Sequence, residues 1–104
     1  MSWREVTTQG YRNVDMTIFA SDEDMAIEIS WDEAWHPDGT LSAVITLRHF
    51  YDWSTGRRTY YLRENFHFDT PGLVEILGNE LIKNFTDDIK RTEILNTIRV
   101  SSVL

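Results

Sequence analysis

Cysteine is absent from this sequence of 104 residues, and proline occurs only at positions 37 and 71. The lack of cysteine excludes disulfide bonds, thiolate metal sites and a cysteine nucleophile, and it fits a reducing compartment. No run of about 18 apolar residues occurs, so no segment is predicted to span a membrane. The N-terminal segment lacks the basic and then apolar parts of a secretory signal peptide. We therefore expect a soluble, cytoplasmic protein.

Basic residues are missing from one long segment. Between Asn13 and Leu47 there is no Lys or Arg, whereas acidic residues occur throughout. The acids are Asp15, Asp22, Glu23, Asp24, Glu28, Asp32, Glu33 and Asp38. The rest of the chain is nearly balanced, so this segment accounts for the net charge of −7. Such a segment can serve solubility alone or steer a basic partner, and it disfavours direct binding to nucleic acid or a membrane surface.

What is present predicts one folded domain over residues 1–104. The apolar fraction is 41%, and the aromatic residues include four Trp, so the chain has enough apolar surface to bury a core.

Period-two alternation of apolar residues predicts strands in the first two-thirds of the chain. Residues 14–18 and 25–31 form an expected hairpin around the polar turn 21–24. Residues 32–40 are interpreted as a connection that contains the turn sequence His36-Pro37-Asp38-Gly39. A third strand is expected at 41–50 and a fourth at 59–68. In the fourth, Tyr60, Leu62, Phe66 and Phe68 are expected on one face, and Tyr61, Arg63, Asn65 and His67 on the other.

Helical periodicity replaces this alternation after Asp69-Thr70-Pro71, where Asp or Thr is a suitable helix cap. Gly78 lies within the expected helix and favours a close approach to the sheet. Thr86-Asp87-Asp88 begins a second helix or lies within a longer one, and the N-terminal residues form a further strand or a short helix. The prediction is an α+β fold: an antiparallel meander of four or five strands, followed by one or two C-terminal helices packed on one face.

Motifs that carry chemistry are missing. His36, His49 and His67 show no paired metal-ligand spacing, although His49 and His67 lie on adjacent predicted strands and are candidate neighbours. The acidic turn 22–24 lacks the alternating pattern of a calcium loop. No nucleophile elbow or glycine-rich phosphate loop occurs. We therefore predict no metal, no cofactor, no catalytic residue and no enzymatic activity.

One strand has the residue types of a nucleic-acid interface. The segment Arg57-Arg58-Thr59-Tyr60-Tyr61-Leu62-Arg63 interleaves arginines with aromatics that can stack on bases. Aromatic residues in strands are more often core or cross-strand pairs, and the negative net charge opposes phosphate binding.

The acidic segment and its tryptophans favour a protein-interaction domain. Trp35 lies among acids and can anchor a basic protein surface, or it can close one end of the core together with Trp31. The expected function is to bind and inhibit a basic partner, in the manner of an immunity protein, antitoxin or anti-defence inhibitor. The partner would be a nuclease toxin or a nucleic-acid-binding effector. Predicted partner-binding residues are Asp22, Glu23, Asp24, Glu28, Asp32, Glu33, Trp35 and Asp38. The alternatives are an accessory or structural subunit of a bacterial or phage assembly, and a small enzyme.

Overall fold

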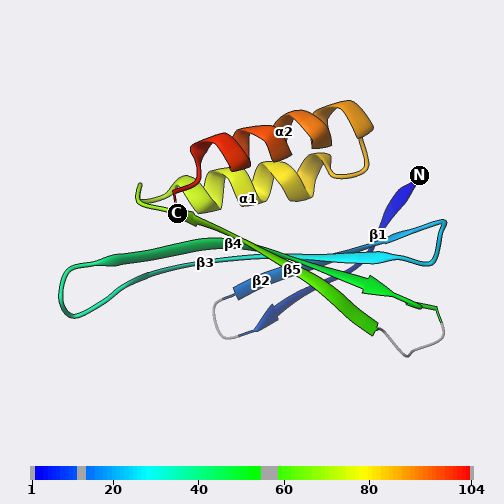
Figure 1. The fold of residues 1–104 in the computed structure, drawn as a ribbon, viewed down its shortest axis with the longest axis horizontal. Helices are drawn as coiled ribbons and strands as arrows, with labels where there is room; N and C mark the ends of the chain where they lie inside the picture. Colours follow the sequence, from blue (N-terminus) through cyan, green and yellow to red (C-terminus); the bar gives the residue numbers. More distant parts are fainter. Residues whose placement is uncertain (1, 12–13, 55–58, 104) are drawn as a thin grey trace.

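Five strands followed by two helices make up the fold in the computed structural model, which describes residues 2–11, 14–54 and 59–103. The strands are β1 (Trp3–Tyr11), β2 (Val14–Ser21), β3 (Ala26–Trp35), β4 (Leu41–Tyr51) and β5 (Thr59–Phe68). The helices are α1 (Leu73–Asn84) and α2 (Asp88–Ser101). Each strand pairs antiparallel with its neighbours in sequence, in the order β1-β2-β3-β4-β5 (Figure 1). The predicted α+β meander is confirmed, and the N-terminal residues supply its fifth strand.

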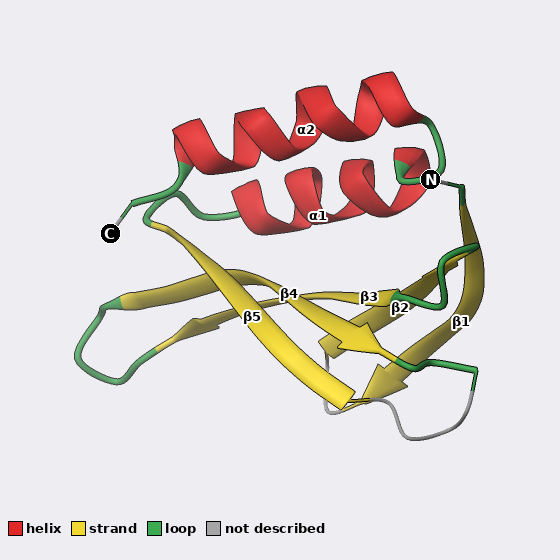
Figure 2. Ribbon diagram, turned by 45° about the vertical axis from the view of Figure 1, so that its right-hand side comes forward, coloured by secondary structure: helices red, strands yellow, loops and turns green. Residues whose placement is uncertain are grey.

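Both helices cover the same face of the sheet (Figure 2). α1 contacts β3 and β4, and α2 packs on α1 and reaches β5. The core lies between these layers and contains Phe19, Ile29, Ile45, Leu47, Phe68, Val74, Leu81, Phe85 and Ile98. Phe85 stacks on Phe19 with ring centroids 4.5 Å apart. We call the opposite face, which no described helix covers, the open face. No helix in the described part of the chain has the length and apolar character needed to cross a membrane.

Gly78 gives α1 its close approach to the sheet, as the sequence predicts. The residue is buried, and a Cβ atom at this position would overlap the indole ring of Trp31 on β3. The Trp31 ring therefore occupies the space that a larger side chain at position 78 would need.

β3 is longer than the sequence predicts, because residues 32–35 continue the strand instead of forming a loop. Residues 32–35 pair with residues 41–44 of β4, although the acidic Glu33 interrupts the apolar pattern of the sequence. The Glu33 side chain lies on the helix-covered side, and its Oε1 accepts a hydrogen bond of 2.7 Å from the backbone N–H of Gly72. Gly72 has φ +81° and caps α1 without a side-chain bond of its own. The expected cap by Asp69 or Thr70 is therefore wrong. Instead, the carboxylate of Glu33 accepts a hydrogen bond from one of the N–H groups that have no partner within the helix at its start.

A separate second helix forms, as one reading of the sequence predicts. Asp87 is its N-cap, and its carboxylate accepts hydrogen bonds from the N–H groups of Ile89 and Lys90. Beyond α2, the N–H of Val103 donates to the carbonyl of His67 at 2.7 Å. The tail thus adds one isolated bridge at the edge of β5.

A β-bulge in the β4–β5 pair changes the expected faces of two tyrosines. Leu62 pairs with His49 and Tyr60 pairs with Phe50, so Tyr61 is the extra residue. Tyr61 contacts the His49 ring, whereas Tyr60 contacts the Phe50 ring on the open face. The predicted faces of Tyr60 and Tyr61 are therefore wrong, because a bulge shifts the alternation by one residue. The side chains of residues 14–16, and residues 57 and 58 altogether, lie outside the part of the chain that the structure describes.

Candidate functional site

The structure distributes the predicted partner-binding residues along the length of β3. Asp22, Glu23 and Asp24 form the β2–β3 turn, and Asp38 lies in the β3–β4 turn. A strand rises about 3.3 Å per residue, so β3 separates these two turns by roughly 30 Å. Figure 1 shows the turns at opposite ends of the sheet. The acids therefore do not form one continuous surface.

The acids on β3 itself point to both faces and have different surroundings. Glu28 lies on the open face, is only 8% exposed, and its Oε1 is 3.7 Å from Nε of Arg48. Asp32 is exposed on the same face, opposite Val44. Glu33 points the other way and caps α1, as described above. Of these three carboxylates, the exposed one is Asp32.

Trp35 and Asp38 lie together at the end of the sheet that contains the β3–β4 turn. Trp35 is 60% exposed, so it does not close the core. The carboxylate of Asp38 accepts hydrogen bonds from the Oγ1 and the N–H of Thr40, at 2.7 and 3.0 Å. Both hydrogen bonds lower the pKa of Asp38, and the bond from the Thr40 hydroxyl has the larger effect. This carboxylate stabilises its own turn.

At the other end, Asp24 joins two loops that are distant in sequence. Its carbonyl accepts a hydrogen bond of 3.2 Å from the N–H of Trp53, and its Oδ1 accepts one of 2.7 Å from the N–H of Ser54. Asp24 and Asp52 both adopt positive φ, at 60° and 52°. Aspartate tolerates this conformation better than most residues, so both loops can turn sharply where they meet.

The joined loops place carboxylates beside aromatic rings. We define the acidic end as Asp22, Glu23, Asp24, Tyr51, Asp52 and Trp53. Asp22, Glu23 and Asp52 are exposed, and Tyr51 is 45% exposed. Tyr51 stacks on Tyr61 with ring centroids 3.9 Å apart, and Trp53 contacts the Phe50 ring at 5.8 Å. The rings of this surface are therefore held in place.

Sequence reasoning missed Asp52 as a member of this surface, although it noted the acidic turn 22–24. The available signal is topological. In an antiparallel meander, alternate turns lie at the same end of the sheet, so the β2–β3 and β4–β5 turns must be neighbours there.

The histidines do not converge. His49 faces the helix-covered side, where its Nε2 is 2.9 Å from Oε1 of Glu64. His67 is opposite Val44, several residues along the β4–β5 ladder from the His49–Leu62 pair. The expectation that these two are neighbours is therefore wrong. Among the side chains that the structure describes, no group of three or more His, Asp or Glu is placed to hold a metal ion.

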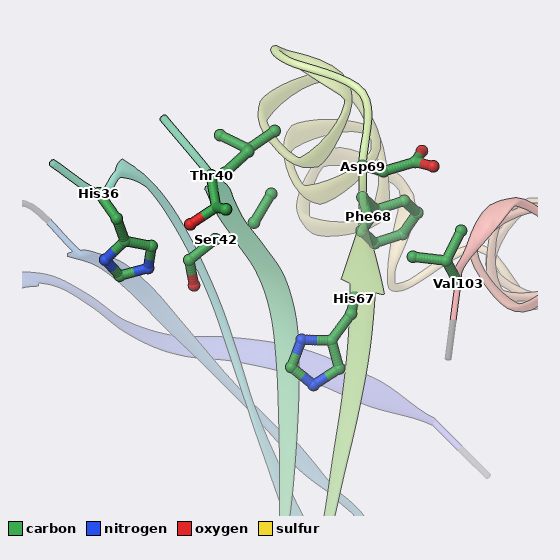
Figure 3. Close-up of a pocket in the computed structure, with 9 residues that line it drawn as sticks. His36, Thr40, Ser42, His67, Phe68, Asp69 and Val103 are labelled. Atoms are coloured by element: carbon green, nitrogen blue, oxygen red, sulfur yellow. The ribbon is translucent and has the colours of Figure 1, made fainter. Parts of the chain in front are cut away.

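A pocket of about 550 Å³ lies at the Trp35 end of the sheet and is lined by His36 and His67 (Figure 3). Thr40, Ser42, Asp69 and Val103 also line it. In Figure 3 the two imidazole rings stand apart, with Ser42 between them and no side chain bridging them. The Thr40 hydroxyl donates to Asp38 and not to a histidine. Among the hydrogen bonds of the described residues, none joins a hydroxyl nucleophile to a base in this pocket.

Comparisons with family models, with curated proteins and with solved structures find no match to this chain.

Proposed function

We propose that this chain is a non-catalytic protein-binding domain that docks its acidic end on a basic partner and blocks it. Immunity proteins, antitoxins and anti-defence inhibitors act in this manner. The observation that carries the proposal is the double hydrogen bond from the β4–β5 loop to Asp24, which brings Asp22, Glu23, Asp24 and Asp52 to one end of the molecule.

Electrostatic attraction supports this choice of partner. The chain has a net charge of −7, and it presents the exposed carboxylates of Asp22, Glu23 and Asp52 on adjoining loops. A complementary charge raises the rate of association and suppresses binding to acidic proteins. Nucleases and other nucleic-acid-binding proteins carry basic clefts for phosphate groups, so a nuclease toxin or a similar effector is the proposed partner class.

The aromatic residues supply the contact area that charges alone do not. Tyr51 is held by its stack on Tyr61 while nearly half of its surface remains exposed. A tyrosine that is already fixed loses little conformational entropy when a partner covers it. We propose that Tyr51 and Trp53 contact the partner and that the carboxylates surround this contact. We also propose a cytoplasmic location, since the sequence has no cysteine.

Affinity capture from the source organism tests the proposal. The loss-of-charge variant is Asp22→Asn/Glu23→Gln/Asp52→Asn, in which each substitution keeps an oxygen acceptor. The matched control is Glu75→Gln/Glu80→Gln/Glu93→Gln, which makes the same change in charge at exposed positions of the two helices. We expect mass spectrometry to find a basic protein retained by the wild type and the control and lost from the first variant.

The purified partner then gives the second measurement. Its association rate with the wild type should fall steeply as salt rises, because surface charges are screened beyond about 8 Å at physiological ionic strength. The wild type and the control variant should inhibit the partner's activity equally, and the loss-of-charge variant should inhibit it less. Equal affinity of the two triple variants, or a rate independent of salt, would refute docking through the acidic end.

A further inference from the structure

Two arginines lie directly opposite each other on the open face. Arg48 of β4 and Arg63 of β5 are paired residues in the antiparallel ladder. Like charges in such a pair repel each other, and both side chains stand on the same face. The neighbouring positions along this face are uncharged on both strands: Thr46 is opposite Asn65, and the Thr46 hydroxyl donates to the Asn65 oxygen at 2.9 Å.

The carboxylates on this face neutralise only part of the charge. Glu28 approaches Nε of Arg48 at 3.7 Å, which leaves the terminal guanidinium N–H groups for other acceptors. Asp32 lies two steps further along the same face, opposite Val44. Arg63 has no ion-pair partner among the described residues, so its charge is uncompensated within that part of the chain.

The β-bulge brings a third donor to the two arginines. Because Tyr61 is the extra residue, Tyr60 lies on the open face, where its ring contacts Phe50 at 6.1 Å. Arg48, Tyr60 and Arg63 together line a pocket of about 250 Å³. Bulges often redirect a side chain towards a functional site, and here the redirected residue has both an aromatic ring and a hydroxyl group.

We propose that this pocket binds the phosphate group of a small phosphorylated molecule. Guanidinium groups recognise phosphate through paired N–H bonds, and the Tyr60 hydroxyl adds a neutral donor. The pocket is larger than a bare phosphate, which leaves room for the organic part of a phosphate monoester. The Tyr60 ring would contact that organic part. A small anion suits this site better than a nucleic acid, because the net charge of −7 repels a long polyanion. The site lies outside the acidic end and is independent of the function proposed above.

An NMR titration of the ¹⁵N-labelled chain tests the site with two probes, inorganic phosphate and phenyl phosphate, at constant chloride. We expect saturable shifts of the amide signals of residues 48, 60 and 63, with tighter binding of phenyl phosphate. Arg63→Gln should weaken both affinities by about tenfold or more, because a charge-assisted hydrogen-bond pair is lost. Arg99→Gln, an exposed change of equal charge on α2, should leave both affinities unchanged.

Two further variants separate geometry from charge and from folding. Arg63→Lys keeps the charge but not the paired donors, so its affinity should fall between those of the wild type and Arg63→Gln. Tyr60→Phe keeps the ring, so it should lose a few-fold in affinity for both probes. In buffer without phosphate, the unfolding midpoint of Arg63→Gln should be no lower than that of the wild type, because the substitution removes a repulsive pair.

Three results would overturn the proposal. The first is a set of shifts that do not saturate, and the second is equal weakening by Arg63→Gln and Arg99→Gln. The third is a single-stranded oligonucleotide that binds at these residues more tightly than phenyl phosphate, which would make the face a nucleic-acid interface. An increase in the unfolding midpoint with phenyl phosphate, in the wild type but not in Arg63→Gln, would support the site by a second method.

Discussion

The two faces of β4 differ although their residues alternate along a single strand. Ala43, Ile45 and Leu47 face the helices and are at most 3% exposed. Val44, Thr46 and Arg48 face the other way and contact polar neighbours on β3 and β5. Apolar burial stabilises the first face, whereas repelling charges are tolerated on the second. The difference indicates that burial under the helices, more than contacts on the open face, sets the stability of this strand.

Truncation of adjacent residues on β4 tests this comparison with the largest expected effect. Ile45→Ala creates a cavity in the fully buried core and should lower the free energy of unfolding by about 2–5 kcal/mol. Val44→Ala on the open face should cost about 1 kcal/mol or less. Urea unfolding measures both. Similar losses for the two variants would mean that the open face is also covered in solution.

A methyl group added at the helix–sheet contact should have the next largest effect. Gly78→Ala improves helix propensity by about 1 kcal/mol, but its new methyl group overlaps Trp31. Overpacking costs typically 1–3 kcal/mol, so we expect net destabilisation of up to about 2 kcal/mol in urea unfolding. Asn79→Ala, at the exposed neighbouring position, should be neutral or slightly stabilising. If Gly78→Ala is also stabilising, α1 does not approach β3 as closely as described.

Removal of a carboxylate should distinguish the two faces of β3. Glu33→Ala leaves the N–H of Gly72 without its acceptor at the start of α1 and should cost about 1–2 kcal/mol. Asp32→Ala changes the same charge at an exposed site on the open face and should cost less than about 0.5 kcal/mol. Hydrogen exchange of the first turn of α1 should increase only in Glu33→Ala. Equal exchange in both variants would contradict the cap.

Alkaline pH gives the smallest expected effect. Burial raises the pKa of Tyr61, and the nearby Tyr51 and Glu64 raise it further. The folded state therefore holds this proton more tightly than the unfolded state does. The resulting stability is present below the ordinary tyrosine pKa of about 10 and is lost as pH rises through the higher folded value.

The measurement is the unfolding midpoint between pH 9 and pH 11.5. Tyr61→Phe should show a shallower decline than the wild type, because it removes the proton that the folded state holds more tightly. Parallel curves for the wild type and Tyr61→Phe would show that this proton does not contribute to stability.

Much of the fold was predictable because burial of one face imposes a period of two on a strand. β5 has the predicted bounds, and the Asp87 cap marks the second helix correctly. The end of β3 was missed because Glu33 interrupts the apolar pattern. That carboxylate faces the helices to serve the N–H of Gly72, which lies 39 residues away in sequence. No local pattern contains this partner.

The sites were less predictable because each depends on contacts between strands. The β-bulge exchanges the faces of Tyr60 and Tyr61, and alternation alone gives no sign of it. The acidic end depends on hydrogen bonds between Asp24 and residues about 30 positions later. The sequence identified the charged and aromatic residue types, whereas the pairing of strands and loops determined which of them are neighbours.

The uncrossed order of the strands has a consequence for biosynthesis. Each strand pairs with the one made just before it, so hairpins can form in turn as the chain leaves the ribosome. The helices that cover Ile29, Ile45 and Phe68 are made after all five strands. A nascent chain that stops before residue 73 would therefore expose a broad apolar surface, and chaperone binding should peak during this interval of translation.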